Sequence, residues 1–176
     1  MTQKIIITGA MGSGKSTVLS ELSQQGLFVF EEPARKILAE QRLINGYGVP
    51  EKDSFVFTHL LLSRSIHYYY EADKSNRDMV LFDRGIADNI AYAKLFNLDV
   101  NPFESAASSF KFNPNVFFLP AWENIYTTDD ERKMTYEQSR QFGDQLKEIY
   151  QRLGYNLIEV PKTSPLKRAK FILGNL

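Results

Sequence analysis

The chain has 176 residues, of which 43% are hydrophobic and 24% charged, and we expect residues 1–176 to form a single globular domain. Lys and Arg together number 21, as do Asp and Glu, so the net charge provides no general attraction for nucleic acid or an anionic membrane. The sequence has no cysteine, which excludes disulfides and thiolate zinc sites. Because no apolar run is long enough for a membrane helix and the first predicted strand leaves no room for a signal peptide before it, we expect a cytoplasmic protein.

Residues 4–17 combine a β-branched run, a glycine-rich turn and the start of a helical pattern. The run at residues 5–7 is Ile-Ile-Ile, which is typical of a buried parallel strand. Residues 9–16 then match G-x-x-x-x-G-K-[ST] at every fixed position. The motif lies between a predicted strand and a predicted helix, so it indicates a phosphate-binding loop rather than a chance glycine-rich turn.

Each residue type in this loop suits a bound triphosphate. Glycines let the backbone approach a phosphate closely, and the amides at the helix start can point at one anion. Lys15 supplies a mobile positive charge, and the Ser16 hydroxyl suits Mg²⁺. We therefore expect ATP and Mg²⁺ as cofactors. The predicted nucleotide-binding residues are Gly9, Met11, Gly12, Ser13, Gly14, Lys15, Ser16 and Thr17.

A second apolar run, Leu27–Phe30, predicts another strand, and Glu31-Glu32-Pro33 follows it. Pro33 suits the first turn of a helix, so Glu32 lies where a strand gives way to a helix. In open α/β sheets this edge faces the ligand crevice. The alternative is a carboxylate that only complements the helix dipole, and position alone does not separate the two.

A long helix is predicted from about Asp53 to Asp73, and a third buried strand at Met79–Phe82. The strand ends in Asp83-Arg84, which is a Walker B arrangement in which the carboxylate holds Mg²⁺ and the arginine clamps a substrate anion. The metal ligands predicted are thus Ser16 and Asp83. A surface ion pair of little energetic value is the alternative.

The remaining chain predicts a helix at 86–95, a mostly irregular segment from Asn97 to Asn115, and strands at 116–119 and 155–160. Between them, residues 121–135 are polar and charged, and we predict a lid in which Arg132 or Lys133 meets the transferred charge, against the alternative of a solvated loop. A final helix begins at Ser164-Pro165. Five apolar strands alternating with helices predict an α/β fold with a parallel sheet covered on both faces.

Three motifs, at residues 9–16, 32–35 and 83–84, together resemble the small AAA-type predicted ATPases related to the nicotinamide riboside kinase domain. More broadly they resemble P-loop nucleoside and nucleotide kinases. The resemblance implies a three-layer P-loop NTPase fold with strand order 2-3-1-4-5. It also implies that Glu32 is the base, that Asp83 and Arg84 contact substrate and metal, and that Arg132 is the lid arginine.

We therefore predict a kinase that transfers the γ-phosphoryl group of ATP to a small hydroxyl-bearing or nucleotide-like acceptor. The alternative is a nucleotide-switched binding protein with slow hydrolysis and a protein or lipid partner. The chain lacks the Asn-Lys-x-Asp guanine motif, which favours ATP over GTP. Nucleic acid is not an expected partner. The acceptor, the oligomeric state and the choice between Glu31 and Glu32 as base are left open.

Overall fold

The computed structural model describes residues 2–127 and 134–176. Its centre is a five-stranded parallel sheet with the order β2-β3-β1-β4-β5, which confirms the predicted fold class and strand order. The strands are β1 (Gln3–Gly9), β2 (Val29–Phe30), β3 (Met79–Asp83), β4 (Asn115–Leu119) and β5 (Asn156–Glu159).

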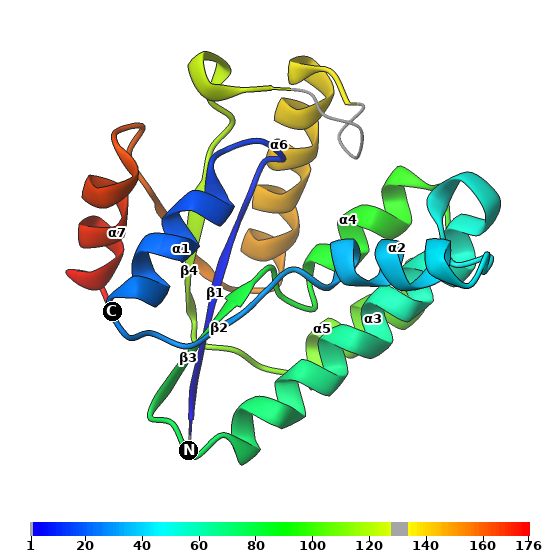
Figure 1. The fold of residues 1–176 in the computed structure, drawn as a ribbon, viewed down its shortest axis with the longest axis horizontal. Coiled ribbons are helices and arrows are strands. Elements are labelled where there is room, and N and C mark those ends of the chain that lie inside the picture. The colour runs from blue at the N-terminus through cyan, green and yellow to red at the C-terminus, as the bar shows by residue number, and fades with distance from the viewer. Residues whose placement is uncertain (1, 128–133) are drawn as a thin grey trace.

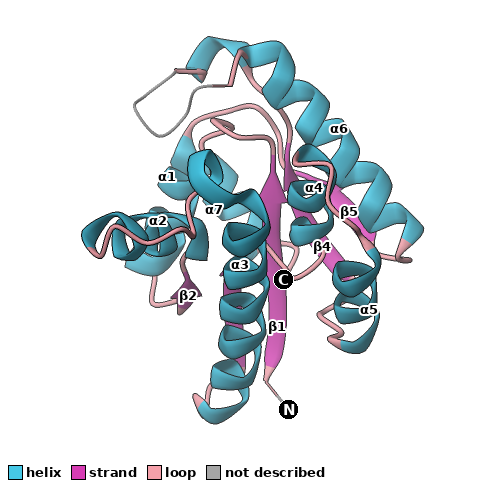
Figure 2. Ribbon diagram, turned by 90° about the vertical axis from the view of Figure 1, so that its right-hand side faces the viewer, coloured by secondary structure: helices cyan, strands magenta, loops and turns pink. Residues whose placement is uncertain are grey.

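Helices cover both faces of this sheet and complete the three layers (Figures 1 and 2). One face carries α1 and α7, and the core on the other side is built with α2 to α6. Within residues 2–127 and 134–176, no helix combines the length and apolar character needed to cross a bilayer. The helices are α1 (Lys15–Gln24), α2 (Pro33–Leu43), α3 (Pro50–Lys74), α4 (Asp88–Leu95), α5 (Asn101–Ser109), α6 (Tyr136–Arg152) and α7 (Pro165–Leu173).

The two cores follow from the alternation of side chains along the central strands. Ile5 and Ile7 of β1 pack with α1 and α7, whereas Ile6 packs with the helices of the other face. Side chains of a strand point alternately to its two faces, so a strand buried on both sides is apolar at every position. This is why the isoleucine run of β1 lies at the centre of the sheet.

The prediction of a mostly irregular segment from Asn97 to Asn115 is wrong, because this segment contains α5. Pro102 lies in the first turn of α5, where a missing backbone N–H costs no hydrogen bond. Phe103, Ala106 and Ala107 follow at helical spacing and are buried. The proline therefore starts a helix here instead of interrupting the chain.

Two predicted boundaries also shift. The predicted long helix starts at Pro50 instead of near Asp53, and the backbone of Asp53 is itself non-helical, so α3 joins two helical pieces across a kink. The predicted second strand shortens to β2, because only Val29 and Phe30 have register partners in β3.

The carboxyl ends of β1, β2 and β3 meet at one edge of the sheet. β1 ends at Gly9, β3 ends at Asp83 beside Ile7, and Glu32 follows β2 by two residues. Gly9 has a φ of 146°, and a Cβ atom there would lie 2.1 Å from the backbone oxygen of Leu119 in β4. Only glycine can therefore stand where the loop leaves the sheet.

We expect Gly9→Ala to lower the free energy of unfolding by roughly 3–5 kcal/mol, because backbone strain and a backbone clash add. Gly26→Ala is the matched control, since Gly26 also has a positive φ, of 91°, but its Cβ would meet nothing within 4 Å. The control should lose only about 1 kcal/mol. Urea unfolding measures both; equal losses would contradict the role of the Leu119 contact.

Candidate active site

The loop between β1 and α1 forms one wall of a cavity of about 710 Å³. α1 begins at Lys15, and the preceding Gly12 and Gly14 have φ values of 73° and 81°. These conformations turn the chain so that the start of α1 lies at the cavity, where its N–H groups and dipole favour an anion. The loop residues that line the cavity are Ala10, Met11, Gly12, Gly14, Lys15, Ser16 and Thr17.

Two residues of the predicted nucleotide-binding set lie elsewhere. Gly9 lies beneath the loop, against Leu119. Ser13 is 1% exposed, and its carbonyl accepts a hydrogen bond from Arg168 of α7 at 2.8 Å. These two positions therefore hold the loop in place, while the other six predicted positions face the cavity.

Four of the predicted catalytic residues form one buried network of alternating charges. Lys15 Nζ lies 2.6 Å from Asp83 Oδ1 and 4.0 Å from Glu32 Oε2. Arg84 Nε donates to Glu32 Oε1 at 2.7 Å. The three segments that provide these side chains, the loop, the β2–α2 junction and the end of β3, are far apart in sequence. The parallel sheet brings them together.

The structure separates the two neighbouring glutamates. The side chain of Glu31 is 72% exposed and pairs with Lys36 at 3.1 Å on the surface. The side chain of Glu32 is 19% exposed, pairs with Arg84 and lines the large cavity. Of the two candidates for the base, Glu32 is therefore the one at the cavity.

Asp88, which sequence reasoning missed, holds Arg84 in an uncommon backbone conformation. Arg84 has a φ of 72°, and its Nη1 donates to the Gly9 carbonyl and to Asp88 Oδ1, both at 3.1 Å. Asp88 is 1% exposed. Its carboxylate also accepts hydrogen bonds from the Gly85 backbone N–H and from the hydroxyls of Thr8 and Tyr150. This set of donors offsets the cost of the strained backbone and of the buried charge.

Tyr92 is a second residue that sequence reasoning missed. Its hydroxyl donates to Glu32 Oε1 at 2.9 Å, so this oxygen accepts from both Tyr92 and Arg84. Tyr92 and Asp88 are four residues apart on α4 and therefore share one face of that helix. This spacing, directly after Asp83-Arg84, was the only signal for either residue in the sequence.

Neighbouring charges set the ionisation of the two carboxyls. Burial acts to raise the pKa of Glu32, but the charges of Arg84 and Lys15 outweigh it. With the hydrogen bond from Tyr92, they lower that pKa to about 2. Burial raises the pKa of Asp83, and the charge of Lys15 opposes this effect. Glu32 is therefore an anion at neutral pH.

Beyond Glu32 the cavity is mainly apolar. Its wall there consists of Ala34, Leu38, Phe57, Tyr92, Leu95 and Phe96. Arg35, Arg42 and Glu51 line it as well, and Arg42 Nη2 lies 3.5 Å from Glu51 Oε1, which joins α2 to α3. The cavity is thus lined by the loop after β1, by the carboxylate of Glu32 and the guanidinium of Arg84, and by apolar and aromatic side chains with charged groups beside them.

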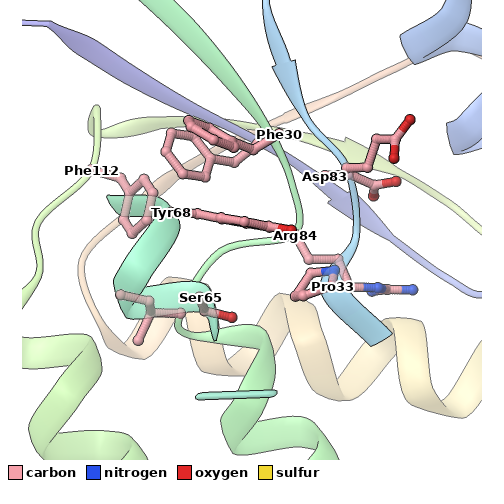
Figure 3. A pocket seen from close by; sticks show the side chains of 10 residues that line it. Phe30, Pro33, Ser65, Tyr68, Asp83, Arg84 and Phe112 are labelled. Carbon is pink, nitrogen blue, oxygen red and sulfur yellow. The ribbon is translucent and has the colours of Figure 1, made fainter. Parts of the chain in front are cut away.

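A second cavity is lined in part by Asp83 and Arg84 (Figure 3). It is lined by Phe30, whose ring stacks on Tyr68 with centroids 4.9 Å apart, and by Phe112. Its volume is about 10 Å³, room for a single water molecule at most. Of these two cavities, only the large one has room for a substrate.

The predicted lid, residues 121–135, is described in part. Its described residues that line the large cavity are Ile125 and Thr127 at one end and Met134 at the other. Arg132 and Lys133 lie outside the described residues, so the role of Arg132 stays a prediction.

The oxygen donors of the site suit Mg²⁺. Ser16 lines the large cavity, and Asp83, at the end of β3, offers a carboxylate beside Lys15 and lines the small cavity. Within residues 2–127 and 134–176, no group of three or more His, Asp or Glu side chains could hold a metal alone. Mg²⁺ bound with nucleotide needs no such group, because phosphates and water supply most of its ligands.

A family model of an AAA domain matches residues 4–168. The chain belongs to this AAA domain family. The resemblance inferred from the three sequence motifs is thereby confirmed. A search among curated proteins gave no match.

Solved structures place this AAA-domain protein in the fold of the P-loop kinases. It is similar to deoxyadenosine kinase from M. mycoides with bound dATP, with a TM-score of 0.71, 19% identity and 98% of each chain covered. It is similar to NadR in complex with NR, with a TM-score of 0.69 and 19% identity over 99% of this chain and 51% of that one. For shikimate kinase from Acinetobacter baumannii the TM-score is 0.58 at 20% identity, covering 99% and 93%. Such identities show the shared fold.

Because Glu32 is ionised in the folded protein, the free energy of unfolding of this AAA-domain protein should depend on pH. Its folded pKa of about 2 lies below the ordinary 4.5, so its stabilisation is complete above pH 4.5 and is lost as the pH falls toward 2. Between pH 7 and pH 3 the parent should therefore lose about 2 kcal/mol more of its unfolding free energy than Glu32→Gln does. Denaturant unfolding at both pH values measures this. Parallel pH profiles for the two proteins would contradict the low pKa.

Proposed function

We propose that this AAA-domain protein is a kinase that transfers the γ-phosphoryl group of ATP to a hydroxyl group of a small acceptor. The observation that carries the proposal is the position of Glu32. It lies between the phosphate-binding loop and the apolar end of one continuous cavity, and it is held by Arg84 and Tyr92. The kinases with the same fold support the proposal.

The loop end of the cavity would hold the triphosphate. Loop amides and the start of α1 would bind the phosphates, and Lys15 would exchange part of its contact with Asp83 for the terminal phosphates. Ser16 and Asp83 would hold Mg²⁺, which neutralises phosphate charge. Arg84 would stabilise the transferred group, and Arg132 would approach it from the lid.

Glu32 would orient the acceptor. Its Oε1 already accepts two hydrogen bonds, whereas Oε2 accepts none from the described residues and has Lys15 Nζ at 4.0 Å. Oε2 is thus placed to accept a hydrogen bond from an acceptor hydroxyl. A carboxylate with a pKa of about 2 is a weak base, so positioning is its larger contribution.

In this reaction the acceptor oxygen forms a bond to the γ-phosphorus, and the bond from that phosphorus to the β–γ bridging oxygen breaks. ADP leaves, and the hydroxyl proton passes to solvent by way of Glu32. An acceptor phosphate would bring further negative charge to the ionised Glu32, whereas a neutral hydroxyl donates to it. This favours a hydroxyl over a phosphate as the attacking group.

The apolar end of the cavity narrows the acceptor further. Phe57 and Phe96 offer aromatic surface there, with ring centroids 6.3 Å apart. Such a wall favours a molecule that has a flat apolar ring as well as its hydroxyl, because a bare polyol would gain little from it. A space for an acceptor beside the loop also favours a kinase over a nucleotide-switched binding protein, which needs none.

Glu32→Gln should reduce kcat about 100-fold or more while the affinity for ATP changes little, because the substitution removes the anion that orients the acceptor. Glu31→Gln is the matched control: the same change at the neighbouring exposed residue should leave kcat unaltered. Acceptor-dependent ADP release, measured over a panel of nucleosides, nucleotides, vitamins and sugars, provides the assay.

Lys15→Ala should abolish detectable ATP binding, because the loop then lacks its phosphate-binding charge. Calorimetric titration with MgATP tests this. The proposal fails if no acceptor in the panel raises ADP release above that of ATP alone, or if Lys15→Ala binds ATP as the parent does.

A further inference from the structure

A buried arginine of the last helix contacts the loop between β1 and α1. Arg168 of α7 is 1% exposed, and its Nη1 donates to the Ser13 carbonyl at 2.8 Å. A Cβ atom at Gly14 would lie 2.9 Å from the same Nη1. α7 packs beside α1, so the C-terminal helix reaches the loop across the face of the sheet (Figure 1).

The charge of Arg168 is not balanced in the way the other cations of the site are. Lys15 pairs with Asp83, and Arg84 pairs with Glu32 and Asp88. Among residues 2–127 and 134–176, no carboxylate forms an ion pair with Arg168, and its Nε and Nη2 make no hydrogen bond. The Trp122 ring lies 5.7 Å from its Cζ atom and gives only a weak cation–π contact.

Such a side chain is costly to keep. Burial lowers the pKa of Arg168, because the charged form loses its contact with water. An unpaired buried cation destabilises a fold, and a well-packed apolar side chain in its place would be the more stable choice. An anion bound at the loop, in contrast, would offset this charge.

We infer that Arg168 is a positioning residue for the nucleotide: it orients the Ser13–Gly14 peptide so that the Gly14 amide faces the phosphates. In a trans peptide the carbonyl of one residue and the N–H of the next point in opposite directions. Arg168 holds the Ser13 oxygen on the buried side. The Gly14 N–H therefore points to the other side, and Gly14 lines the cavity.

The positive charge adds to this geometric effect. A cation on the carbonyl polarises the peptide and strengthens its N–H as a donor. Arg168 thus acts through the backbone, and it needs no direct contact with the ligand. The inference rests on the proposed nucleotide binding at this loop, and it adds a second support that lies 153 positions after Lys15 in the chain.

The test compares Arg168→Met with Arg168→Lys and with Lys167→Met, an exposed position one residue away on α7. The probes are MgATP and magnesium tripolyphosphate, which has the phosphates but no base. We expect Arg168→Met to raise the Kd for both probes about tenfold and by the same factor. Arg168→Lys should recover most of the affinity, and Lys167→Met should bind as the parent does.

Two further readouts separate positioning from a merely structural role. In the kinase assay, Arg168→Met should raise the KM for ATP and leave the KM of the acceptor unchanged. In NMR spectra, tripolyphosphate should shift the Gly14 amide proton downfield in the parent and much less in Arg168→Met, even in a fully folded sample. If Arg168→Met cannot be purified folded, Arg168→Lys carries the NMR comparison with a smaller, still measurable, loss of that shift.

The inference is overturned if folded Arg168→Met binds tripolyphosphate as tightly as the parent, or if the Gly14 shift is unchanged in the variants. A parent chain that binds neither MgATP nor tripolyphosphate would overturn the proposed function and this inference together. The two failures are thus told apart by the parent alone.

Discussion

The buried ion pair between Lys15 and Asp83 is the interaction on which the site depends. It joins the phosphate-binding loop to the end of β3 at 2.6 Å, with both side chains almost fully buried. Two charges withdrawn from water at this depth are stable only together, because either one alone would be an uncompensated buried charge. The pair therefore keeps the lysine at the cavity before any ligand arrives, and it gives Glu32 a nearby cation.

From this pair the charges alternate outward to Glu32, Arg84 and Asp88. Each carboxylate has a cation as its neighbour, so Glu32 keeps its negative charge despite burial. In the proposed function, a polyphosphate in the cavity would compete with Asp83 for Lys15, and the strength of the existing pair would set how much binding energy this exchange consumes. In the proposed function the site would thus be arranged for anions before they bind. The Lys15–Asp83 pair would lower the affinity for the polyphosphate, because part of this pair must be given up on binding.

How far the sequence could predict this arrangement depends on how local each signal is. The loop at residues 9–16, the Glu32 junction and Asp83-Arg84 each follow an apolar strand within a few residues, and the parallel sheet places all strand ends at one edge. Short-range patterns therefore identified the four central residues. The strand order needed the family resemblance, because spacing alone does not distinguish which strands are neighbours.

The parts that could not be predicted are those that depend on contacts between distant segments. Asp88 reads as an ordinary acidic residue in the first turn of α4, and Arg168 as a basic residue of an amphipathic helix. Their roles become visible only in the folded protein, where Asp88 accepts a hydrogen bond from Tyr150, 62 residues away, and Arg168 donates one to Ser13, 155 residues away. α5 was missed for the opposite reason: a local signal, Pro102, was read as an interruption although it occupies the one turn of a helix that accepts it.

The φ of 72° at Arg84 connects these observations. A non-glycine residue in this region costs free energy, and the surrounding contacts must outweigh that cost for it to persist. Three hydrogen bonds from the Arg84 guanidinium serve here: Nε donates to Glu32, and Nη1 donates to the Gly9 carbonyl and to Asp88. With an extended backbone, the side chain of Arg84 would instead point to one face of the sheet, as the side chains of β3 do. The strained backbone after β3 therefore allows one side chain to contact Gly9, Glu32 and Asp88 of α4 at once.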